Sequence, residues 1–195
     1  MKTLILMRHS EPDKSTGAPN DRIPLSPRGR EKAQAFFCRE DCRAVSRVIS
    51  SPYLRARETA ELSGLPVSED ARLIERQLGQ PDTLDKSFWA RQYADPDFRN
   101  ESGESFREVR QRMNSAVRDV LGALPEGETA LVVSHAAAIC AWLGQFCTVE
   151  VTDAAHKLRR ITWEGRVLLD GPFPTPGAFV LRLEGELLAD LTFLA

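Results

Sequence analysis

The chain has 195 residues, of which 42% are hydrophobic and 28% are charged. This length favours a single domain with a sizeable core, and the composition excludes disordered and fibrous classes. The 26 cationic and 28 anionic side chains give a formal net charge of −2, which predicts no general affinity for nucleic acid or anionic membranes. The cations comprise 21 Arg and only 5 Lys. Codon usage and a need for bidentate anion binding both account for this ratio, and composition does not distinguish them.

The sequence shows no targeting segment and no membrane span. Its N-terminal apolar run, residues 4–7, is too short for a signal peptide, and no stretch approaches the 18 apolar residues of a span. The four cysteines include no Cys-x-x-Cys pair and no nearby His at zinc spacing, so we expect buried free thiols. We therefore expect a cytoplasmic protein with no metal and no cofactor.

Apolar runs and turn residues predict strands that alternate with helices. The predicted strands cover residues 3–7, 44–49, 67–73 and 129–133, and a hairpin covers 177–194. The predicted helices cover residues 27–39, 52–63, 83–94, 104–124 and 136–146. This alternation favours an α/β fold, namely a three-layer α/β/α sandwich with a mostly parallel central sheet.

Two of the predicted helices begin with the same dipeptide. Ser26 precedes Pro27, and Ser51 precedes Pro52. Serine is a preferred N-cap residue and proline is favoured at the first helical position. We therefore expect both helices to start at the proline.

Polar residues of related character follow three of the predicted strands. They are Arg8-His9 after the first, Ser50-Ser51 with Arg55 soon after the second, and Ser134-His135 after the third. Ligands of parallel sheets bind beyond the carboxyl ends of the strands. If these strands are neighbours, two arginines and two histidines converge at one edge of the sheet.

Such a cluster suits phosphate chemistry. The planar fork of arginine matches phosphate oxygens, and the N-termini of the helices after Ser51 and His135 add N–H donors, Ala136 among them. A neutral imidazole can attack phosphorus, and the leaving oxygen then needs a proton. Glu75, which follows the strand predicted over 67–73, is a candidate donor. Each residue alone is more often structural, so the joint placement carries the hypothesis.

Several segments resemble, in order and spacing, the histidine phosphatase (phosphoglycerate mutase-like) superfamily over roughly residues 3–143. An Arg-His signature is followed by a Leu-Ser-Pro-x-Gly helix start and a Ser-Pro-x-x-Arg-Ala element. A segment with the acid, a Gly-Glu-Ser helix opening and a Ser-His element complete the order. The segments cover residues 7–12, 25–34, 50–60, 73–79, 103–105 and 132–135.

The resemblance implies a role for each site residue. His9 would be the nucleophile and carry the phosphate as phosphohistidine. Arg8, Arg55 and His135 would bind the phosphoryl group and stabilise the charge on its oxygens. Glu75 would protonate the leaving oxygen and then activate water. No metal is implied, because cationic side chains take the place of magnesium.

The sequence departs from the family pattern at two positions. Ser10 stands where the family has a glycine, and Ala136-Ala137 stand where it has two. The backbone N–H donors survive both changes, while a Cβ could crowd a phosphate. The hydroxyl of Ser10 is an added donor, so Ser10 and Ala136 are candidate phosphate-binding residues.

The region outside these motifs supports fewer inferences. We expect one domain over 1–195 with a cap-like insertion around 76–102, in which Arg and aromatic side chains could recognise a substrate. Those side chains are Trp89, Arg91, Tyr93 and Arg99. Beyond about residue 148 no segment matches a motif. We expect surface positions for His156, Arg159, Arg160 and Trp163, and the lining of a substrate pocket is the alternative.

The compact length fits the phosphatase branch of the superfamily better than its mutases. The leading hypothesis is a metal-independent phosphomonoesterase that acts on a small phosphate ester. A phosphomutase and a non-catalytic phosphate-binding module are the alternatives. The expected partner is a small phosphorylated substrate or inorganic phosphate, with no nucleic acid and no membrane, and the oligomeric state is left open.

Overall fold

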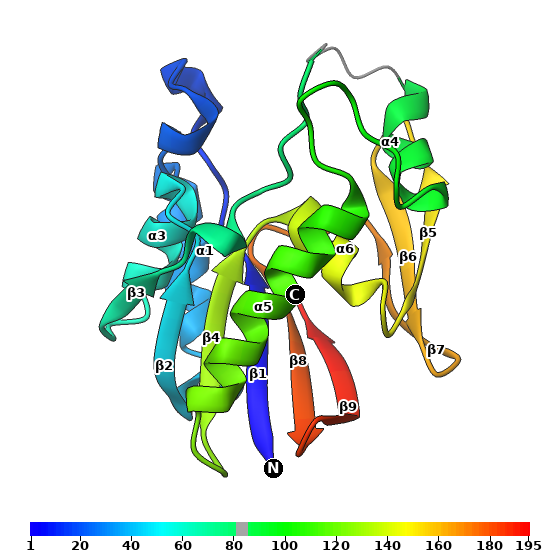
Figure 1. The fold of residues 1–195 in the computed structure, drawn as a ribbon. Helices are drawn as coiled ribbons and strands as arrows, with labels where there is room; N and C mark the ends of the chain where they lie inside the picture. Colours follow the sequence, from blue (N-terminus) through cyan, green and yellow to red (C-terminus); the bar gives the residue numbers. More distant parts are fainter. Residues whose placement is uncertain (81–85) are drawn as a thin grey trace. The chain divides into compact units, whose positions relative to one another are not determined.

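The computed structural model describes residues 1–80 and 86–195, which form two compact units (Figure 1). The first unit comprises Met1–Ile74, Ala116–His135 and Pro174–Ala195, and the second comprises Glu75–Ser115 and Ala136–Phe173. The segment 76–102 belongs to the second unit together with later parts of the chain. The start predicted for the helix over 83–94 lies outside the described residues.

The first unit is built on a six-stranded sheet with the strand order β3-β2-β4-β1-β8-β9. Its strands are β1 (Lys2–Arg8), β2 (Val45–Ser50), β3 (Val67–Glu69), β4 (Thr129–Ser134), β8 (Gly177–Glu184) and β9 (Leu187–Leu194). The β3-β2, β2-β4 and β4-β1 pairs are parallel, whereas β8 and β9 join as an antiparallel hairpin. The predicted α/β fold with a mostly parallel sheet is confirmed.

Helices pack on this sheet because its central strands are apolar on both faces. The helices are α1 (Pro27–Phe37), the short α2 (Glu40–Arg43), α3 (Leu54–Glu61) and α5 (Phe106–Ala123), with single 3-10 turns at Lys14–Thr16, Asn20–Arg22 and Ala71–Leu73. In β1, Ile5 and Met7 join a core cluster with Phe36 of α1 and Ala56 of α3. Alternate residues such as Leu6 point to the other face. Figure 1 shows the C-terminal part of α5 on that face.

The two Ser-Pro helix starts have different outcomes. Ser26 caps α1 as predicted, since its hydroxyl accepts the N–H of Gly29 at 2.9 Å and Pro27 is the first helical residue. The start predicted at Pro52 is wrong, because α3 begins at Leu54. The hydroxyl of Ser51 accepts the N–H of Tyr53 at 3.3 Å and lies 2.8 Å from Nε2 of His135, and Tyr53 is the N-cap residue of α3.

The second unit combines helices with a small antiparallel sheet. It contains α4 (Lys86–Ala94), the first turns of α5, α6 (Ala136–Leu143) and the strands β5 (Thr148–Asp153), β6 (Leu158–Trp163) and β7 (Arg166–Gly171). These strands pair in the order β5-β6-β7. No strand was expected between residues 148 and 173 from the sequence.

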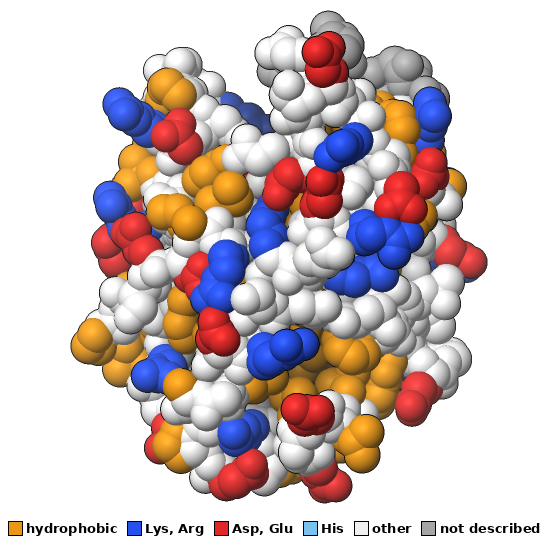
Figure 2. Space-filling model, in the orientation of Figure 1, with side chains coloured by type: hydrophobic (Ala, Val, Ile, Leu, Met, Phe, Trp, Pro, Cys, Tyr) orange, Lys and Arg blue, Asp and Glu red, His pale blue; other side chains and the backbone are white. Residues whose placement is uncertain are grey.

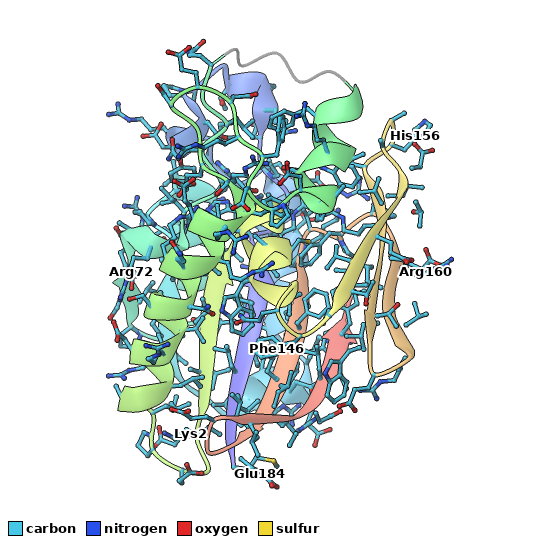
Figure 3. All side chains as sticks on the ribbon, turned by 45° about the vertical axis from the view of Figure 1, so that its right-hand side comes forward. Lys2, Arg72, Phe146, His156, Arg160 and Glu184 are labelled. Atoms are coloured by element: carbon cyan, nitrogen blue, oxygen red, sulfur yellow. The ribbon has the colours of Figure 1, made fainter. Side chains whose placement is uncertain are left out.

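The strand β6 corrects two of the surface positions expected after residue 148. Its side chains alternate, so that Arg159 and Trp163 are buried. His156 and Arg160 are exposed as expected and project outward in Figure 3. An arginine at an inward-facing position hides the alternating apolar pattern by which a strand is recognised.

The charge distribution on the surface agrees with the expectation from the sequence, whereas the burial of the cysteines agrees only in part. Basic and acidic side chains are interspersed on the face shown in Figure 2. Within residues 1–80 and 86–195, no helix has the length and apolar character that crossing a membrane requires. All four cysteines are free, with Cys140 and Cys147 buried, whereas the expected burial is wrong for the exposed Cys38 and incomplete for Cys42.

Candidate active site

The carboxyl ends of three neighbouring strands meet in the first unit. Strand β4 lies between β1 and β2, with Arg8 opposite Ser134 in the parallel register. The backbone N–H of His9 donates to the carbonyl of Ser134 at 3.0 Å, and that of Ser51 donates to the carbonyl of Val133 at 2.9 Å. The predicted convergence of the strand ends is confirmed, and it brings the two histidines together.

Arg55 of α3 links the two histidines. Its Nε–H donates to Nε2 of His9 at 3.1 Å, and its Nη2 lies 3.2 Å from Nδ1 of His135. Its Nη1 donates to the carbonyl of Asn20. The guanidinium is 5% exposed, and the two imidazole centroids are 5.1 Å apart. The buried cationic group therefore contacts both imidazoles at the end of the sheet.

The hydrogen-bond partners assign the tautomer of each histidine. Nδ1 of His9 lies 2.7 Å from the carbonyl oxygen of Ser10, which only accepts, so Nδ1 carries the proton. Nε2 of His9 then has the lone pair. Nδ1 of His135 faces the donor Arg55, so its Nε2 carries the proton and donates to Oγ of Ser51 at 2.8 Å.

The electrostatic environment keeps His9 neutral. Burial lowers the pKa of His9 well below its ordinary value of 6.5, and the positive charges of Arg55 and Arg8 lower it further. A neutral imidazole has the free lone pair that a nucleophile needs. The nitrogen with that lone pair is Nε2, on the side of Arg55.

Two neighbours of this cluster were not predicted as site residues. Oγ of Ser51 accepts a hydrogen bond from Nε2 of His135, although Ser51 was expected only as a helix cap. The ring of Tyr53 lies 5.0 Å from the ring of His135 and 5.1 Å from the guanidinium carbon of Arg55. One feature of the sequence could have pointed to Ser51 and Tyr53, namely their position between the end of a predicted strand and Arg55.

The structure gives Ser10 a structural role. Its N–H donates to Oγ1 of Thr59 at 2.9 Å, and its hydroxyl donates to the carbonyl of Gly29 at 2.7 Å. A Cβ at Gly29 would lie 2.1 Å from the carbonyl oxygen of Glu11, so the loop after β1 approaches α1 very closely. Since both donors of Ser10 have protein acceptors, we do not retain Ser10 as a phosphate-binding candidate.

Glu75 begins the second unit, where it caps helix α6. Its Oε1 accepts the N–H of Arg76 at 2.9 Å and that of Ala138 at 3.0 Å, and its Oε2 accepts the N–H of Ala137 at 3.3 Å. The N-terminus of α6 favours a negative charge at this position. The N–H groups of Ala137 and Ala138 at the start of α6 are therefore occupied by Glu75. Ala136, which directly follows His135 in the chain, is not among these three donors.

The residues expected to recognise a substrate from the cap have separate environments in the second unit. The guanidinium of Arg91 stacks on Phe98 at 4.1 Å. Arg99 forms an exposed ion pair with Glu108 at 2.7 Å. Exposed, internally paired arginines of this kind suit a solvated surface better than a binding site.

Trp89 and Tyr93 instead contact Arg159, which comes from β6. The guanidinium carbon of Arg159 lies 4.9 Å from the ring of Trp89, and its Nη1 lies 3.2 Å from the hydroxyl of Tyr93. This contact leaves no local signal in the sequence, because Arg159 is 66 positions from Tyr93 in the chain. No three His, Cys, Asp or Glu side chains of the described part of the chain come together as a metal site.

Comparison with known proteins identifies the family. The model of the histidine phosphatase superfamily (branch 1) matches residues 4–162. The chain therefore belongs to the histidine phosphatase superfamily.

Named relatives and solved structures agree with this. The chain is 33% identical over 129 residues to the probable phosphoglycerate mutase GpmB of Citrobacter koseri, a match that spans 60% of this chain and 60% of that protein. YhfR of Bacillus stearothermophilus has a TM-score of 0.70 and 25% identity, covering 100% of this chain and 95% of that one. A mycobacterial glucosyl-3-phosphoglycerate phosphatase in complex with inorganic phosphate shares the fold, with a TM-score of 0.69, 21% identity and coverage of 100% and 95%.

Proposed function

We propose that the chain is a phosphomonoesterase that hydrolyses a small phosphate ester through a phosphohistidine on His9. The observation that carries this proposal is the position of Arg55 between the two histidines, with the lone pair of His9 Nε2 directed at it. Guanidinium and phosphate are complementary, so the oxygens of a bound phosphoryl group would accept the Arg55 N–H groups that now face the two imidazoles.

The first step transfers the phosphoryl group to the enzyme. Nε2 of His9 attacks phosphorus and forms the P–N bond, while the bond from phosphorus to the ester oxygen breaks. Arg8, Arg55 and His135 stabilise the negative charge on the remaining phosphoryl oxygens. In the resting state, Nε2 of His135 donates to Ser51. To donate to the phosphoryl group, His135 would redirect this N–H or carry a second proton on Nδ1. Glu75 gives its proton to the departing oxygen.

The second step returns the enzyme to its initial state. Glu75 accepts a proton from water, the water oxygen attacks phosphorus, and the P–N bond to His9 breaks. Inorganic phosphate then leaves. The two oxygens of Glu75 accept three backbone N–H groups, which hold the carboxyl group in a fixed orientation for both proton transfers.

The proposed reaction needs no metal. The fixed positive charges of Arg8 and Arg55 supply the stabilisation that magnesium supplies in other phosphoryl-transfer sites. We propose Ala136 as a backbone donor to the phosphoryl group, and the segment 76–102 as part of a cap that selects the substrate.

Hydrolysis of an aryl phosphate in excess chelator tests the proposal. We expect wild-type activity to persist in chelator and His9→Ala to lose it. His156→Ala is the matched control, since His156 is an exposed histidine bonded to Asp153. Rapid quenching of the wild type with substrate in denaturant at alkaline pH, where the P–N bond persists, should show one added phosphoryl group in the intact mass, and His9→Ala should show none.

Three results would contradict parts of the proposal. If the wild type is inactive on every phosphomonoester, the proposed enzymatic activity is excluded and the phosphate-binding module remains. Loss of activity in chelator would remove the metal-free mechanism. Activity that survives His9→Ala would remove the nucleophile.

A phosphomutase is the second candidate, because the relative from Citrobacter koseri is named a probable phosphoglycerate mutase. The same phosphohistidine would then return its phosphoryl group to a hydroxyl of the product rather than to water. Incubation with 3-phosphoglycerate distinguishes the two, since a mutase yields an isomer with little free phosphate and a phosphatase yields free phosphate.

A further inference from the structure

The two imidazoles of the candidate site are held by acceptors of different kinds. The acceptor for Nδ1 of His9 is the backbone carbonyl of Ser10 at 2.7 Å, which any residue at that position would supply. The acceptor for Nε2 of His135 is a side chain, the hydroxyl of Ser51 at 2.8 Å. The orientation of His135 therefore depends on a side chain to which the proposed mechanism gives no part.

Ser51 has a fixed position at the carboxyl end of β2. It directly follows that strand, its side chain is fully buried, and its backbone N–H donates to the carbonyl of Val133 in β4 at 2.9 Å. Its carbonyl accepts the hydroxyl of Ser50 at 2.8 Å, and its own hydroxyl also accepts the N–H of Tyr53 at 3.3 Å. These bonds fix the hydroxyl beside the imidazole, so Ser51 can orient the ring.

The ring of His135 is fully buried between aromatic neighbours. The centroid of its imidazole lies 5.1 Å from that of His9 and 5.0 Å from that of Tyr53. A buried N–H without an acceptor is costly, so the oxygen of Ser51 favours the orientation in which Nε2 faces it. The same orientation turns Nδ1 toward Nη2 of Arg55, at 3.2 Å.

The two polar contacts of this ring should respond differently to phosphate. In the proposed reaction the phosphoryl oxygens accept the N–H groups of Arg55, so the contact at Nδ1 is exchanged for one with the phosphoryl group. The hydroxyl of Ser51 lies at the other nitrogen and can keep its bond throughout. This geometry favours a second proton on Nδ1 over redirection of the Nε2–H.

We propose that Ser51 is a positioning residue whose hydroxyl accepts the Nε2–H of His135 and keeps Nδ1 of that ring directed at the phosphoryl group. Ser51 acts through His135 and does not itself touch the substrate. This inference rests on the proposed phosphatase function and adds to it a residue without direct contact to the phosphoryl group. All of the residues concerned lie in the first unit.

Imidazole NMR reads the proposed bond directly. The chain has three histidines, so His9→Gln and His156→Gln variants assign the ring signals. In the wild type we expect a downfield Nε2–H signal of His135 both with and without saturating inorganic phosphate. In Ser51→Ala this signal should move upfield, because the proton loses its acceptor. The Nδ1–H signal of His9 should stay in place, because its acceptor is a backbone carbonyl.

Two further variants separate hydrogen bonding from shape. Ser51→Thr keeps a hydroxyl, whereas Ser51→Cys keeps the approximate shape and offers only a weak acceptor. We expect kcat/KM for an aryl phosphate to fall about 30-fold in Ser51→Ala and Ser51→Cys, and to stay within about threefold of the wild type in Ser51→Thr. The unfolding midpoints of all variants are measured alongside.

Ser134→Ala is the matched control. Ser134 ends the neighbouring strand β4, is fully buried like Ser51, and donates its hydroxyl to the carbonyl of Leu73 at 2.7 Å. Its replacement removes a buried hydroxyl without changing the partners of the His135 ring nitrogens. We expect a lower unfolding midpoint and an unchanged Nε2–H signal of His135. If Ser51→Thr does not fold, the comparison of Ser51→Ala with Ser134→Ala decides.

The outcomes separate this inference from the proposed function. An unchanged Nε2–H signal in Ser51→Ala, or its loss when inorganic phosphate binds to the wild type, would overturn the role of Ser51 and leave the phosphatase intact. Equal activity of the wild type and folded Ser51→Ala would do the same. A wild type inactive on every phosphomonoester would overturn the proposed function, and the NMR signals would still decide whether Ser51 orients His135.

Discussion

The Nε–H of Arg55 lies 3.1 Å from Nε2 of His9, so the arginine donates to the lone pair that the proposed attack on phosphorus requires. The resting nucleophile is therefore engaged by the group that should bind its target. In the proposed reaction, the substrate phosphate draws the guanidinium onto its own oxygens and so frees Nε2. The proposed mechanism therefore couples phosphate binding to exposure of the His9 lone pair.

Replacement of Arg55 by lysine should impair both proposed functions of its guanidinium, which are binding of the phosphoryl group and contact with His9. Lysine keeps a positive charge but presents no planar pair of donors to two acceptors. We expect kcat/KM for an aryl phosphate to fall about 100-fold. Arg57→Lys is the control, because Arg57 lies on the same helix, half-exposed, 3.5 Å from Glu61. Equal activity of Arg55→Lys and Arg57→Lys would refute a role for the fork.

The low pKa of His9 should make folding stability depend on pH. The unfolded chain protonates His9 near its ordinary pKa of 6.5, whereas burial, Arg55 and Arg8 lower the pKa in the folded chain. Below pH 6.5 the unfolded state therefore binds more protons, and the free energy of unfolding falls as pH decreases toward the folded pKa. Urea unfolding across pH 7.5 to 5 should show a shallower decline in His9→Gln than in the wild type. The exposed His156→Gln should decline like the wild type, and parallel curves for all three proteins would contradict the prediction.

Gly29 should be irreplaceable for a steric reason. A Cβ there would meet the carbonyl oxygen of Glu11 at 2.1 Å, so Gly29→Ala forces the loop after His9 away from α1. We expect a loss of about 2 kcal/mol in the free energy of unfolding, measured by urea titration, together with reduced activity. Gly122→Ala in α5 is the control, because nothing lies within 4 Å of its added Cβ, and we expect a gain of about 0.5–1 kcal/mol. A Gly29→Ala variant as stable as the wild type would disprove the close approach.

Glu75→Gln should reveal the proton transfer through the choice of leaving group. An alkyl ester needs a proton on its departing oxygen, whereas p-nitrophenolate leaves without one. We expect kcat for glycerol 3-phosphate to fall about 100-fold or more, and kcat for p-nitrophenyl phosphate to fall far less when transfer to His9 limits the rate. The exposed Glu150→Gln should leave both values unchanged. Equal losses on the two esters would argue against Glu75 as the acid.

The sheet and the strand ends were accessible to sequence-based prediction for a physical reason. A strand buried on both faces is a continuous apolar run, and residues 4–7 and 130–133 show that signal without ambiguity. Parallel pairing then places the residues after each run at one edge. The position of the helix α3 was less predictable, because Ser51 could cap a helix or serve His135 equally well in sequence terms.

The environment of Arg159 shows the opposite limit. Its strand has no motif, and the arginine replaces an apolar residue in the alternating pattern, so a surface position was the natural expectation. Burial followed from contacts with Trp89, Tyr93 and Cys140, which lie on α4 and α6. Contacts between residues so far apart in the chain leave no local signal.

By itself, the sequence determined the family, the alternating α/β order and the identity of the residues at the strand ends, because local apolar periodicity and motif spacing encode them. Only the tertiary structure decided which hydrogen-bond partners the residues around the site have. The hydroxyl of Ser10 donates to the carbonyl of Gly29, and the N–H groups of Ala137 and Ala138 donate to Glu75. Nε2 of His135 donates to Oγ of Ser51. Hydrogen bonds depend on distances of a few tenths of an ångström between elements, and that precision arises only when the chain is packed.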